Sequence, residues 1–259
     1  FMKLYVLDLG RIVMVGDNPV TKGEEENPSI PIHAFLLDSP AGKILFDTGC
    51  HPEAMEGAWM KEVCENPYVP GPDGTLLNRL AQIGVAPGAI SLVVASHLHL
   101  DHAGGLHLFP NAQVLVQGQE LEHVLTDAEA GNSSVFYQPC DLENWKRSGV
   151  RWRPVDEKEL PLCSGVTVLN LGPGHAYGML ALLVELQCGN FLLVADAVYS
   201  IIHYGPPAQL AGVVQDEAGY FQTIENIRAI AAQRHATVLY GHDMAQFQSL
   251  VKSTEGYYE

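Results

Sequence analysis

The stretch that decides the fold reads His97-Leu98-His99-Leu100-Asp101-His102-Ala103-Gly104-Gly105 and follows the apolar run Leu92-Val93-Val94-Ala95 directly. It holds three imidazoles and one carboxylate within six positions. These groups suit zinc and its first-row neighbours, and alternate residues of an extended chain point to the same side. We therefore expect His97 and His99 on one side, with Asp101 and His102 at a second position nearby, so that one segment serves two metals. Solvated surface histidines are the alternative, but they seldom follow a buried strand and lead into Gly-Gly.

The composition is that of a globular protein with a substantial core. The chain has 259 residues, of which 47% are hydrophobic and 17% charged, and its net charge is −16. Such a charge repels a phosphate backbone, so we expect no nucleic-acid partner. No apolar run is long enough to span a bilayer, and the start lacks a signal-peptide pattern, so we expect a cytoplasmic protein without a membrane partner. Met2 is the expected natural start, with Phe1 left over from cloning.

Short apolar runs bounded by turn residues recur along the chain. They predict strands rather than helices, because most are four to seven residues long and rich in Val, Leu and Ile. Helical spacing predicts helices at Leu76–Ile83, Gln119–Ala130 and Asp216–Gln233. We therefore expect one α/β domain over residues 2–259. The predicted strands are Lys3–Asp8, His33–Leu37, Lys43–Phe46, Leu92–Ala95, Gln113–Val116, Val166–Leu169, Leu180–Leu186, Phe191–Val194 and Thr237–Tyr240, and the apolar stripe of the last helix holds Phe221, Ile224, Ile227 and Ala231.

Three further candidate ligands follow the same pattern of an apolar strand and then a polar turn. His175, Asp196 and His242 each come just after such a run. Taken singly, they have ordinary interpretations as a turn residue, a helix cap and a buried histidine. A two-metal site needs more ligands than one loop supplies, however, so the first motif favours a metal-binding role for all three.

The count of ligands predicts an open, dinuclear site. One metal is expected to bind His97, His99 and His175, and Asp196 is expected to bridge to a second metal held by Asp101, His102 and His242. Four protein ligands for each ion leave positions for a bridging water and a substrate oxygen, which is a catalytic arrangement. Two divalent ions are therefore expected in each chain. Zinc is the first choice, and manganese, iron and cobalt accept the same ligands.

These seven ligands, in this order and at these separations, resemble the metallo-β-lactamase superfamily. The resemblance implies an αβ/βα four-layer sandwich, in which two mixed sheets are flanked by helices and the metals lie at one edge of the sheets. Phe46-Asp47-Thr48-Gly49 matches a further pattern of the superfamily, in which the aspartate orients the ligand histidines without binding metal. For Asp47 alone, an ordinary turn at the end of a strand is the alternative.

Within the superfamily the chain resembles the N-acyl homoserine lactonases. These enzymes carry a tyrosine three residues after the bridging aspartate, and Tyr199 matches it; a buried packing role is the alternative. Two departures leave the identity of the lactone open. Leu100 replaces an aromatic residue common in the lactonases, and His175-Ala176-Tyr177-Gly178-Met179 departs from the usual His-Thr-Pro-Gly-His.

The resemblance implies a metal-dependent hydrolase that opens the lactone ring of N-acyl homoserine lactones to the hydroxy acid and so takes part in quorum quenching. Hydroxide is expected to attack the carbonyl, with Tyr199 donating to the oxyanion and Asp101 carrying the proton to the departing alkoxide. Apolar residues after Cys50 and after Tyr199 are candidates for the wall that receives the acyl chain. They are equally suited to cover a second copy, so a monomer and a homodimer both stay open. The candidate pocket residues are Trp59, Met60, Ile201 and Tyr204.

Three other functions remain as alternatives. A pyridoxolactonase-like hydrolase of another small lactone has the same ligands and a similar ending to Gly241-His242-Asp243-Met244. A glyoxalase II-like thioesterase also shares the ligands, but it normally adds a helical C-terminal part, whereas this chain ends seventeen residues after His242. A non-catalytic metal-binding scaffold would be expected to have lost ligands, and all seven are present here.

Overall fold

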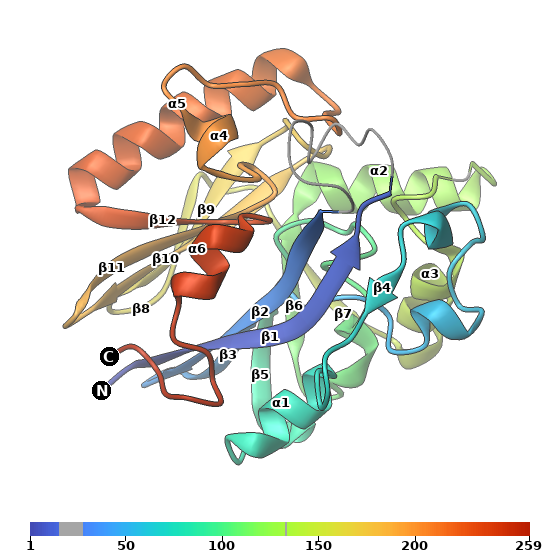
Figure 1. The fold of residues 1–259 in the computed structure, drawn as a ribbon, viewed down its shortest axis with the longest axis horizontal. Helices are drawn as coiled ribbons and strands as arrows, with labels where there is room; N and C mark the ends of the chain where they lie inside the picture. The colour runs from blue at the N-terminus through green and yellow to red at the C-terminus, as the bar shows by residue number, and fades with distance from the viewer. Residues whose placement is uncertain (16–27, 133) are drawn as a thin grey trace.

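The computed structural model describes residues 1–15, 28–132 and 134–259. Two β-sheets lie face to face, and helices cover the outer face of each sheet (Figure 1). The predicted sandwich of two mixed sheets between helices is therefore confirmed. None of the helices in the described ranges combines the length and the apolarity that a bilayer crossing needs.

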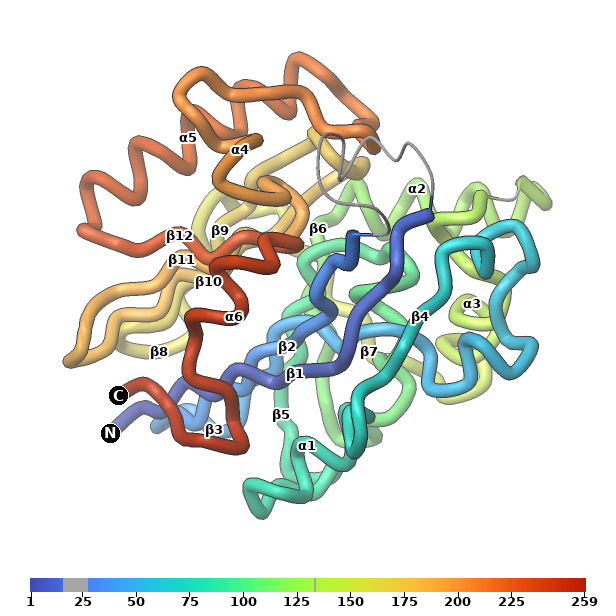
Figure 2. The backbone as a smooth tube through the Cα atoms, in the orientation of Figure 1, coloured from blue at the N-terminus to red at the C-terminus, as the bar shows by residue number. Residues whose placement is uncertain are grey.

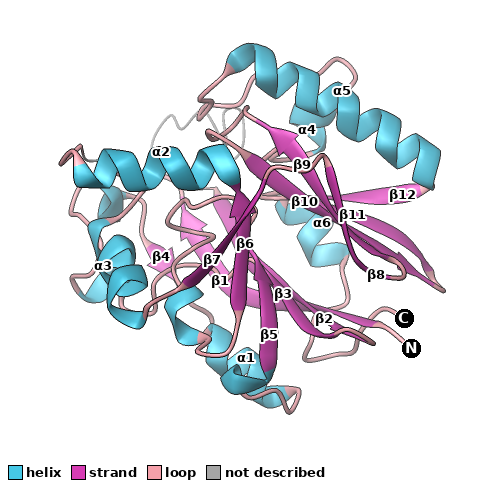
Figure 3. Cartoon of the chain, turned by 180° about the vertical axis from the view of Figure 1, so that it is seen from behind, coloured by secondary structure: helices cyan, strands magenta, loops and turns pink. Residues whose placement is uncertain are grey.

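The larger sheet has seven strands in the order β4-β1-β2-β3-β5-β6-β7. Its first half is antiparallel, and the strands from β3 through β5 and β6 to β7 are parallel. Helices α1, α2 and α3 lie on its outer side, as seen from behind in Figure 3. The elements are β1 Lys3–Val13, β2 Ser29–Ser39, β3 Gly42–Phe46, β4 Tyr68–Val69, β5 Ile90–Val94, β6 Gln113–Gln117 and β7 Arg151–Val155, with α1 Leu76–Gln82, α2 Gly118–Glu129 and α3 Pro139–Ser148.

The smaller sheet has five strands in the order β12-β11-β10-β9-β8, and only β11 and β12 pair in parallel. Helix α5 runs along its outer face, and the N- and C-terminal ends of the chain lie side by side (Figure 2). Their proximity agrees with the antiparallel bridge between Leu4 and Tyr258. The elements are β8 Glu159–Cys163, β9 Val166–Gly172, β10 Met179–Leu186, β11 Gly189–Ala195 and β12 Ala236–Tyr240, with α4 Ile201–Tyr204, α5 Glu217–Arg234 and α6 Met244–Ser249.

Apolar side chains fill the three spaces between the four layers. Between the sheets, Val6 and Phe46 from the larger sheet pack in one cluster with Val168 and Leu182 from the smaller. A second cluster lies under α1 to α3, and a third lies under α5. Because each sheet is covered on both faces, the strand ends at one edge are the natural place for a solvent-accessible site.

The sheet-facing stripe of α5 shares Ile224 and Ile227 with the predicted stripe and differs from it at the other two positions. Tyr220, Ile224 and Ile227 are buried on it, whereas Phe221 and Ala231 are only partly buried. The ring of Tyr220 takes the core position while its hydroxyl donates to the carbonyl of Gln209 at 2.7 Å. A tyrosine thus fills a place that hydrophobicity alone would assign to the neighbouring phenylalanine.

Every predicted strand and helix overlaps an observed one, but β4, β7, β8, α3, α4 and α6 were not predicted. Pro154 in β7 and Pro161 in β8 argue against strands in the sequence. Both strands lie at the edge of their sheet, where a missing backbone donor costs little. Edge position explains why a proline-containing stretch can still form a strand.

Helix α3 carries a carboxyl group whose burial makes stability depend on pH. Asp141 is buried, and within the described residues its Oδ2 has no hydrogen-bond partner. Burial raises its pKa from 3.8 to about 7. The folded chain therefore keeps this proton over a range in which the unfolded chain has lost it. As a consequence, the free energy of unfolding falls as the pH rises through that range.

We expect Asp141→Asn to gain stability relative to the parent as the pH rises from about 4 to about 7. A tenfold difference in proton affinity between the folded and unfolded chains corresponds to about 1.4 kcal/mol, so the gain reaches at most about 4 kcal/mol. Urea unfolding of both proteins across this pH range measures it, with the exposed Glu143→Gln on the same helix as control. A stability difference that stays constant with pH would contradict the prediction.

Candidate metal centre

The seven predicted ligands meet at one edge of the sandwich because each follows a strand that ends there. The segment from His97 to His102 follows β5 of the larger sheet. His175, Asp196 and His242 follow β9, β11 and β12 of the smaller sheet. All seven side chains are buried, with at most 8% of any residue exposed. The site therefore lies between the sheets and depends on both.

The ligand atoms fall into two groups, the same two sets that the sequence predicts. His97, His99 and His175 form one group, and Asp101, His102, Asp196 and His242 form the other, with all ligand atoms of a group within 4.8 Å of one another. We call them the three-histidine group and the two-aspartate group.

Asp196 lies between the two groups. Its Oδ2 is 3.4 Å from His175 Nε2, in the three-histidine group. Its Oδ1 is 3.1 Å from Nε2 of both His102 and His242, in the two-aspartate group. Oδ2 is also 3.1 Å from His242 Nε2, so the carboxylate as a whole reaches ligand atoms of both groups, as a bridging carboxylate must.

Hydrogen bonds on the far side of the rings fix which nitrogen faces the site. His175 Nδ1 lies 2.8 Å from the carbonyl of Val213, and His242 Nδ1 lies 3.1 Å from that of Pro31. A carbonyl only accepts, so Nδ1 carries a proton and Nε2 is the nitrogen that faces the site. His102 Nδ1 similarly lies 2.7 Å from a carboxylate oxygen of Asp47. The Nε2 atoms of these histidines therefore face the site and can act as ligands once any proton that they carry is released.

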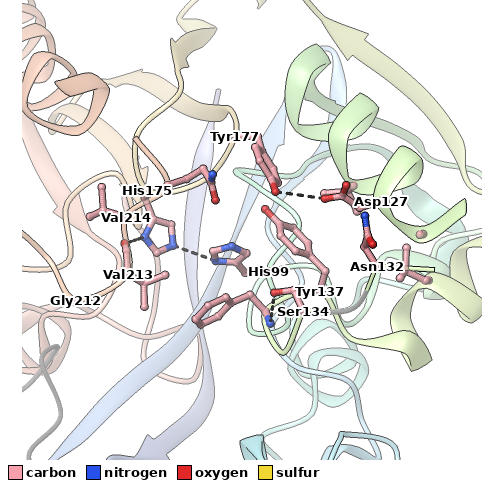
Figure 4. Close-up of a pocket in the computed structure, with 15 residues that line it drawn as sticks. His99, Asp127, Asn132, Ser134, Tyr137, His175, Tyr177, Gly212, Val213 and Val214 are labelled. Carbon is pink, nitrogen blue, oxygen red and sulfur yellow. Dashed lines mark hydrogen bonds between the residues drawn. The ribbon is translucent and has the colours of Figure 1, made fainter. Parts of the chain in front are cut away.

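The donor set fits two divalent cations. Within the described residues, His97 Nε2, His102 Nε2 and Asp196 Oδ1 are buried without a hydrogen-bond partner. Leaving a buried polar atom unpaired costs about 1–3 kcal/mol, and more for a charged group. His99 Nδ1 also lies only 3.1 Å from His175 Nε2, as the dashed line in Figure 4 marks. Cations between these lone pairs would satisfy atoms that the protein alone leaves unpaired.

The charges of the metal-free site agree with this fit. Burial by itself would raise the pKa of the Asp196 carboxyl, but His102 and His242 outweigh it and hold the pKa well below its usual range. Burial lowers the pKa of His97 and of His99, so both imidazoles are neutral. The carboxylates outweigh burial at His242 and raise its pKa to about 10. In the metal-free site, protons on histidines balance the negative charge of the carboxylates. Metal ions would supply that positive charge instead, so metal binding should release protons.

Asp47 contacts the ligands in the way that the sequence predicts. It follows β3, and its Oδ1 accepts the backbone N–H of Ser96 at 2.7 Å. Its Oδ2 accepts the Ser96 hydroxyl at 2.7 Å and faces His102 Nδ1. The Ser96 oxygen lies in turn 2.9 Å from His97 Nδ1. Asp47 therefore orients one histidine directly and a second through a serine.

Of the two predicted catalytic side chains, Asp101 belongs to the two-aspartate group and Tyr199 lies beside the three-histidine group. Asp101 Oδ2 is 3.1 Å from His242 Nε2 and 3.4 Å from His102 Nε2. The hydroxyl of Tyr199 is 3.3 Å from His175 Nδ1, and the tyrosine is 4% exposed. Both side chains line a cavity of about 270 Å³ over the ligands. Tyr199 is therefore buried from solvent but faces the space in which a substrate would lie.

Two cavities meet at His99 and His175, and their linings differ. The first, of about 270 Å³, is mainly apolar. The second, of about 380 Å³, holds Asp127, whose carboxylate accepts the Tyr177 hydroxyl at 3.3 Å (Figure 4). We call them the apolar and the polar cavity. Besides ligands and Tyr199, the apolar cavity is lined by Ile12, Met14, Ile30, Trp59, Glu62, Val63, Asn66, Leu100, Val135, Phe136 and Val213.

Of the four predicted pocket residues, only Trp59 is among the described residues that line the apolar cavity. The Met60 backbone N–H donates to Gln138 Oε1 at 2.8 Å, which fixes that residue toward α3. Ile201 begins the short helix α4 and is 54% exposed. Tyr204, also in α4, packs against Tyr240. The structure thus places Ile201 and Tyr204 in α4 and Met60 beside the start of α3, outside the described lining of the apolar cavity.

Sequence reasoning also missed Glu120, a fully buried carboxyl group near the ligands. It accepts the backbone N–H of Leu98, which lies between two ligand histidines, at 2.9 Å. In the sequence, a glutamate three residues after Gln117 at the start of a helix indicates ordinary capping. Its actual partners are distant in sequence and are seen only in the fold.

Comparisons with known proteins agree with this geometry. Residues 29–242 match the model of the metallo-beta-lactamase superfamily. The chain is 42% identical over 273 residues to the N-acyl homoserine lactonase AiiB of Agrobacterium fabrum, and the match covers 99% of each protein. It is 30% identical over 269 residues to the N-acyl homoserine lactonase AttM of Azorhizobium caulinodans, covering 100% of this chain and 99% of that protein.

A solved structure has the same fold over nearly the whole chain. It is a mutant of AiiA from B. thuringiensis with N-decanoyl-L-homoserine bound at the active site, and it superimposes with a TM-score of 0.80. The sequence identity is 25%, and the match covers 98% of both chains. By its sequence and its fold, this chain belongs to the metallo-beta-lactamase superfamily, in the branch that contains the N-acyl homoserine lactonases.

Proposed function

We propose that this protein opens the lactone ring of N-acyl homoserine lactones by hydrolysis and releases the open hydroxy acid. The observation that carries the proposal is the apolar cavity, which lies directly over two metal-ligand groups and is lined by Tyr199 and Asp101. The names of the relatives AiiB and AttM support it, and so does the acyl-homoserine bound in the AiiA structure.

Two divalent ions, zinc in the simplest case, would be held by the three-histidine group and the two-aspartate group, with Asp196 bridging. When bound, they would supply hydroxide near neutral pH and positive charge beside the carbonyl. The protein's own contribution is to hold the ligand atoms, to exclude bulk water and to place Tyr199 and Asp101 next to the reacting carbon.

Tyr199 is suited to donate a hydrogen bond to the developing oxyanion. Burial raises the pKa of its hydroxyl well above the usual value, and the nearby Asp196 raises it further, so the proton stays on the oxygen. His175 Nδ1 commits its own proton to the carbonyl of Val213. The Tyr199 hydroxyl therefore has no acceptor on that ring and can donate to the substrate. An oxyanion donor of this kind stabilises chiefly the transition state.

Asp101 is suited to move the proton. His102 and His242 overcome the effect of burial and keep its pKa well below the usual range, so it is a carboxylate. It can accept the proton of the attacking water and deliver it to the alkoxide that leaves when the ring C–O bond breaks. The proton lost by the nucleophile then ends on the hydroxyl of the product, so the step balances.

The apolar cavity predicts how rate depends on acyl-chain length. We expect kcat/KM to rise with each added carbon until the chain fills the cavity, because each buried methylene contributes up to about 0.8 kcal/mol. A panel of homoserine lactones of graded chain length, with plain γ- and δ-lactones, a thioester and a β-lactam, measures this. Much faster turnover of the thioester, or of a compact polar lactone suited to the polar cavity, would contradict the proposed substrate and leave the metal hydrolase intact.

The role of Tyr199 predicts a specific kinetic change. Tyr199→Phe keeps the ring and removes the donor, so we expect kcat to fall by about 100–1000-fold while KM changes little. Tyr204→Phe, on α4 and away from the cavity lining, is the control and should leave both values unchanged. A fall in kcat/KM that comes entirely from KM would assign Tyr199 to substrate binding.

The biological setting follows from the substrate. We propose that the protein acts on acyl homoserine lactone signals in the cytoplasm and that its role is quorum quenching. Its proposed partner is the lactone rather than nucleic acid or membrane. Both a monomer and a homodimer are compatible with this function, because every ligand comes from one chain.

A further inference from the structure

We propose that Glu120 is a positioning residue that aligns the three-histidine group, and that its loss would weaken one metal of the pair selectively. This inference rests on the proposed dinuclear centre but not on the identity of the lactone. It concerns a side chain that lies outside both ligand groups and both cavity linings.

Hydrogen-bond donors from three residues converge on the Glu120 carboxylate. Its Oε2 accepts the backbone N–H of Leu98 at 2.9 Å, and its Oε1 accepts that of Tyr177 at 3.0 Å. The hydroxyl of Tyr137 lies 3.1 Å from Oε1 and 3.0 Å from Oε2. The two oxygens thus hold two different backbone segments, and a tyrosine closes the arrangement.

These contacts reach each member of the three-histidine group. Leu98 lies between His97 and His99, so fixing its N–H fixes the backbone that carries both rings. Tyr177 comes two residues after His175, in the loop after β9. The first segment follows a strand of the larger sheet and the second a strand of the smaller. Glu120 therefore sets the spacing across the sandwich at this group.

Tyr137 adds a contact from the side. Its ring packs edge-on against that of His99, with 4.9 Å between the ring centroids. Figure 4 shows Tyr137 and His99 next to each other among the residues that line the polar cavity. The hydroxyl that Glu120 holds thus belongs to the ring that supports a ligand histidine.

The two-aspartate group has no such contact with Glu120 in the described part of the chain. His102 is oriented by Asp47, and His242 by the carbonyl of Pro31. Asp196 follows β11, which carries no partner of Glu120. The two groups are therefore supported by different residues, and removing one support should affect the two ions unequally.

The cost of burying this carboxylate argues for a role beyond packing. Glu120 is fully buried, and burial raises its pKa to about 7 although its backbone and tyrosine donors lower it. No lysine or arginine of the described residues forms an ion pair with it. An apolar residue would avoid the desolvation cost, but it would leave the N–H groups of Leu98 and Tyr177 without acceptors.

Glu120→Gln is the informative change because it keeps size and shape. A carboxylate offers two acceptor oxygens, whereas an amide offers one oxygen and one NH₂ donor. In the variant, one of the two backbone N–H groups therefore faces a donor and loses its bond. The segment of Leu98 or that of Tyr177 is then released, and the three histidines lose their common geometry.

The experiment titrates the metal-free protein with Zn²⁺ in competition with a chromophoric chelator. We expect Glu120→Gln to lower the affinity for one of the two Zn²⁺ ions by about 10–100-fold and to leave the affinity for the other nearly unchanged. This is the usual effect of removing a partner that orients metal ligands. The exposed Glu122→Gln on the same helix is the control and should match the parent. Equal weakening of both equivalents, or of neither, would overturn the proposal.

Two further variants assign the affected equivalent and guard against misfolding. In a double-mutant cycle, Glu120→Gln should add little to His99→Ala, which already disrupts the same group. If the Gln variant fails to fold, Tyr137→Phe decides, because it removes one hydrogen bond and keeps the ring. Tyr137→Phe should weaken the binding of the same zinc ion a few-fold. If the variant binds both zinc ions as tightly as the parent, the proposal is overturned. The lactone panel on the unsubstituted protein tests the proposed function separately.

Discussion

Asp196→Ala is expected to reduce the zinc content from two equivalents to nearly none and to bring lactone hydrolysis to background. The side chain faces both groups, with Oδ2 3.4 Å from His175 Nε2 and Oδ1 3.1 Å from His102 Nε2. Its removal takes one ligand from each ion and leaves the imidazoles to repel one another as they protonate. Elemental analysis after reconstitution measures the loss.

His242→Ala provides the comparison, because this side chain belongs to the two-aspartate group alone. His242→Ala should weaken the binding of mainly one zinc ion and leave the other ion bound. A preparation of Asp196→Ala that retains one full equivalent would show that this carboxylate serves a single ion, and the assignment of Asp196 as a bridge would then be wrong.

Asp101→Asn is expected to lower kcat by about two to four orders of magnitude with both ions restored, which is the range for general acid–base catalysis. The amide keeps an oxygen toward His242 and His102 but cannot carry a proton between the attacking water and the leaving alkoxide. Single-turnover rates on protein of verified metal content measure the chemical step. A metal-replete variant with near-normal kcat would leave Asp101 as a ligand only.

The ligand set was predictable because its information is local. Each ligand stands just after an apolar run, and the two sheets place the ends of β5, β9, β11 and β12 at one edge. The segment from His97 to His102 supplies side chains to both groups, so a single short motif already contributes to both candidate metal sites. The ends of the predicted strands and the metal-binding chemistry of the side chains that follow them were therefore enough to predict most of the site.

The features of the site that the sequence did not predict depend on contacts between distant parts of the chain. The partner of His175 Nδ1 is the carbonyl of Val213, thirty-eight residues away, and a backbone carbonyl leaves no trace in the sequence. Glu120 has the spacing of a helix cap, but its carboxylate binds loops from two sheets. Ile201 was placed in the pocket by its hydrophobicity, whereas the turn into α4 exposes it. Side-chain direction after a turn is set by backbone geometry that hydrophobic periodicity does not report.

Because each ligand group draws on both sheets, the bound ions would also be part of what keeps the sandwich closed. A ligand that binds only the folded state stabilises it by an amount that grows with the logarithm of its concentration, about 4.1 kcal/mol at a thousand times its dissociation constant. Chelation would therefore weaken the contact between the sheets at this edge, although the apolar core between them stays. For this protein, the supply of metal in the cell would set its resistance to heat and proteolysis as well as its activity.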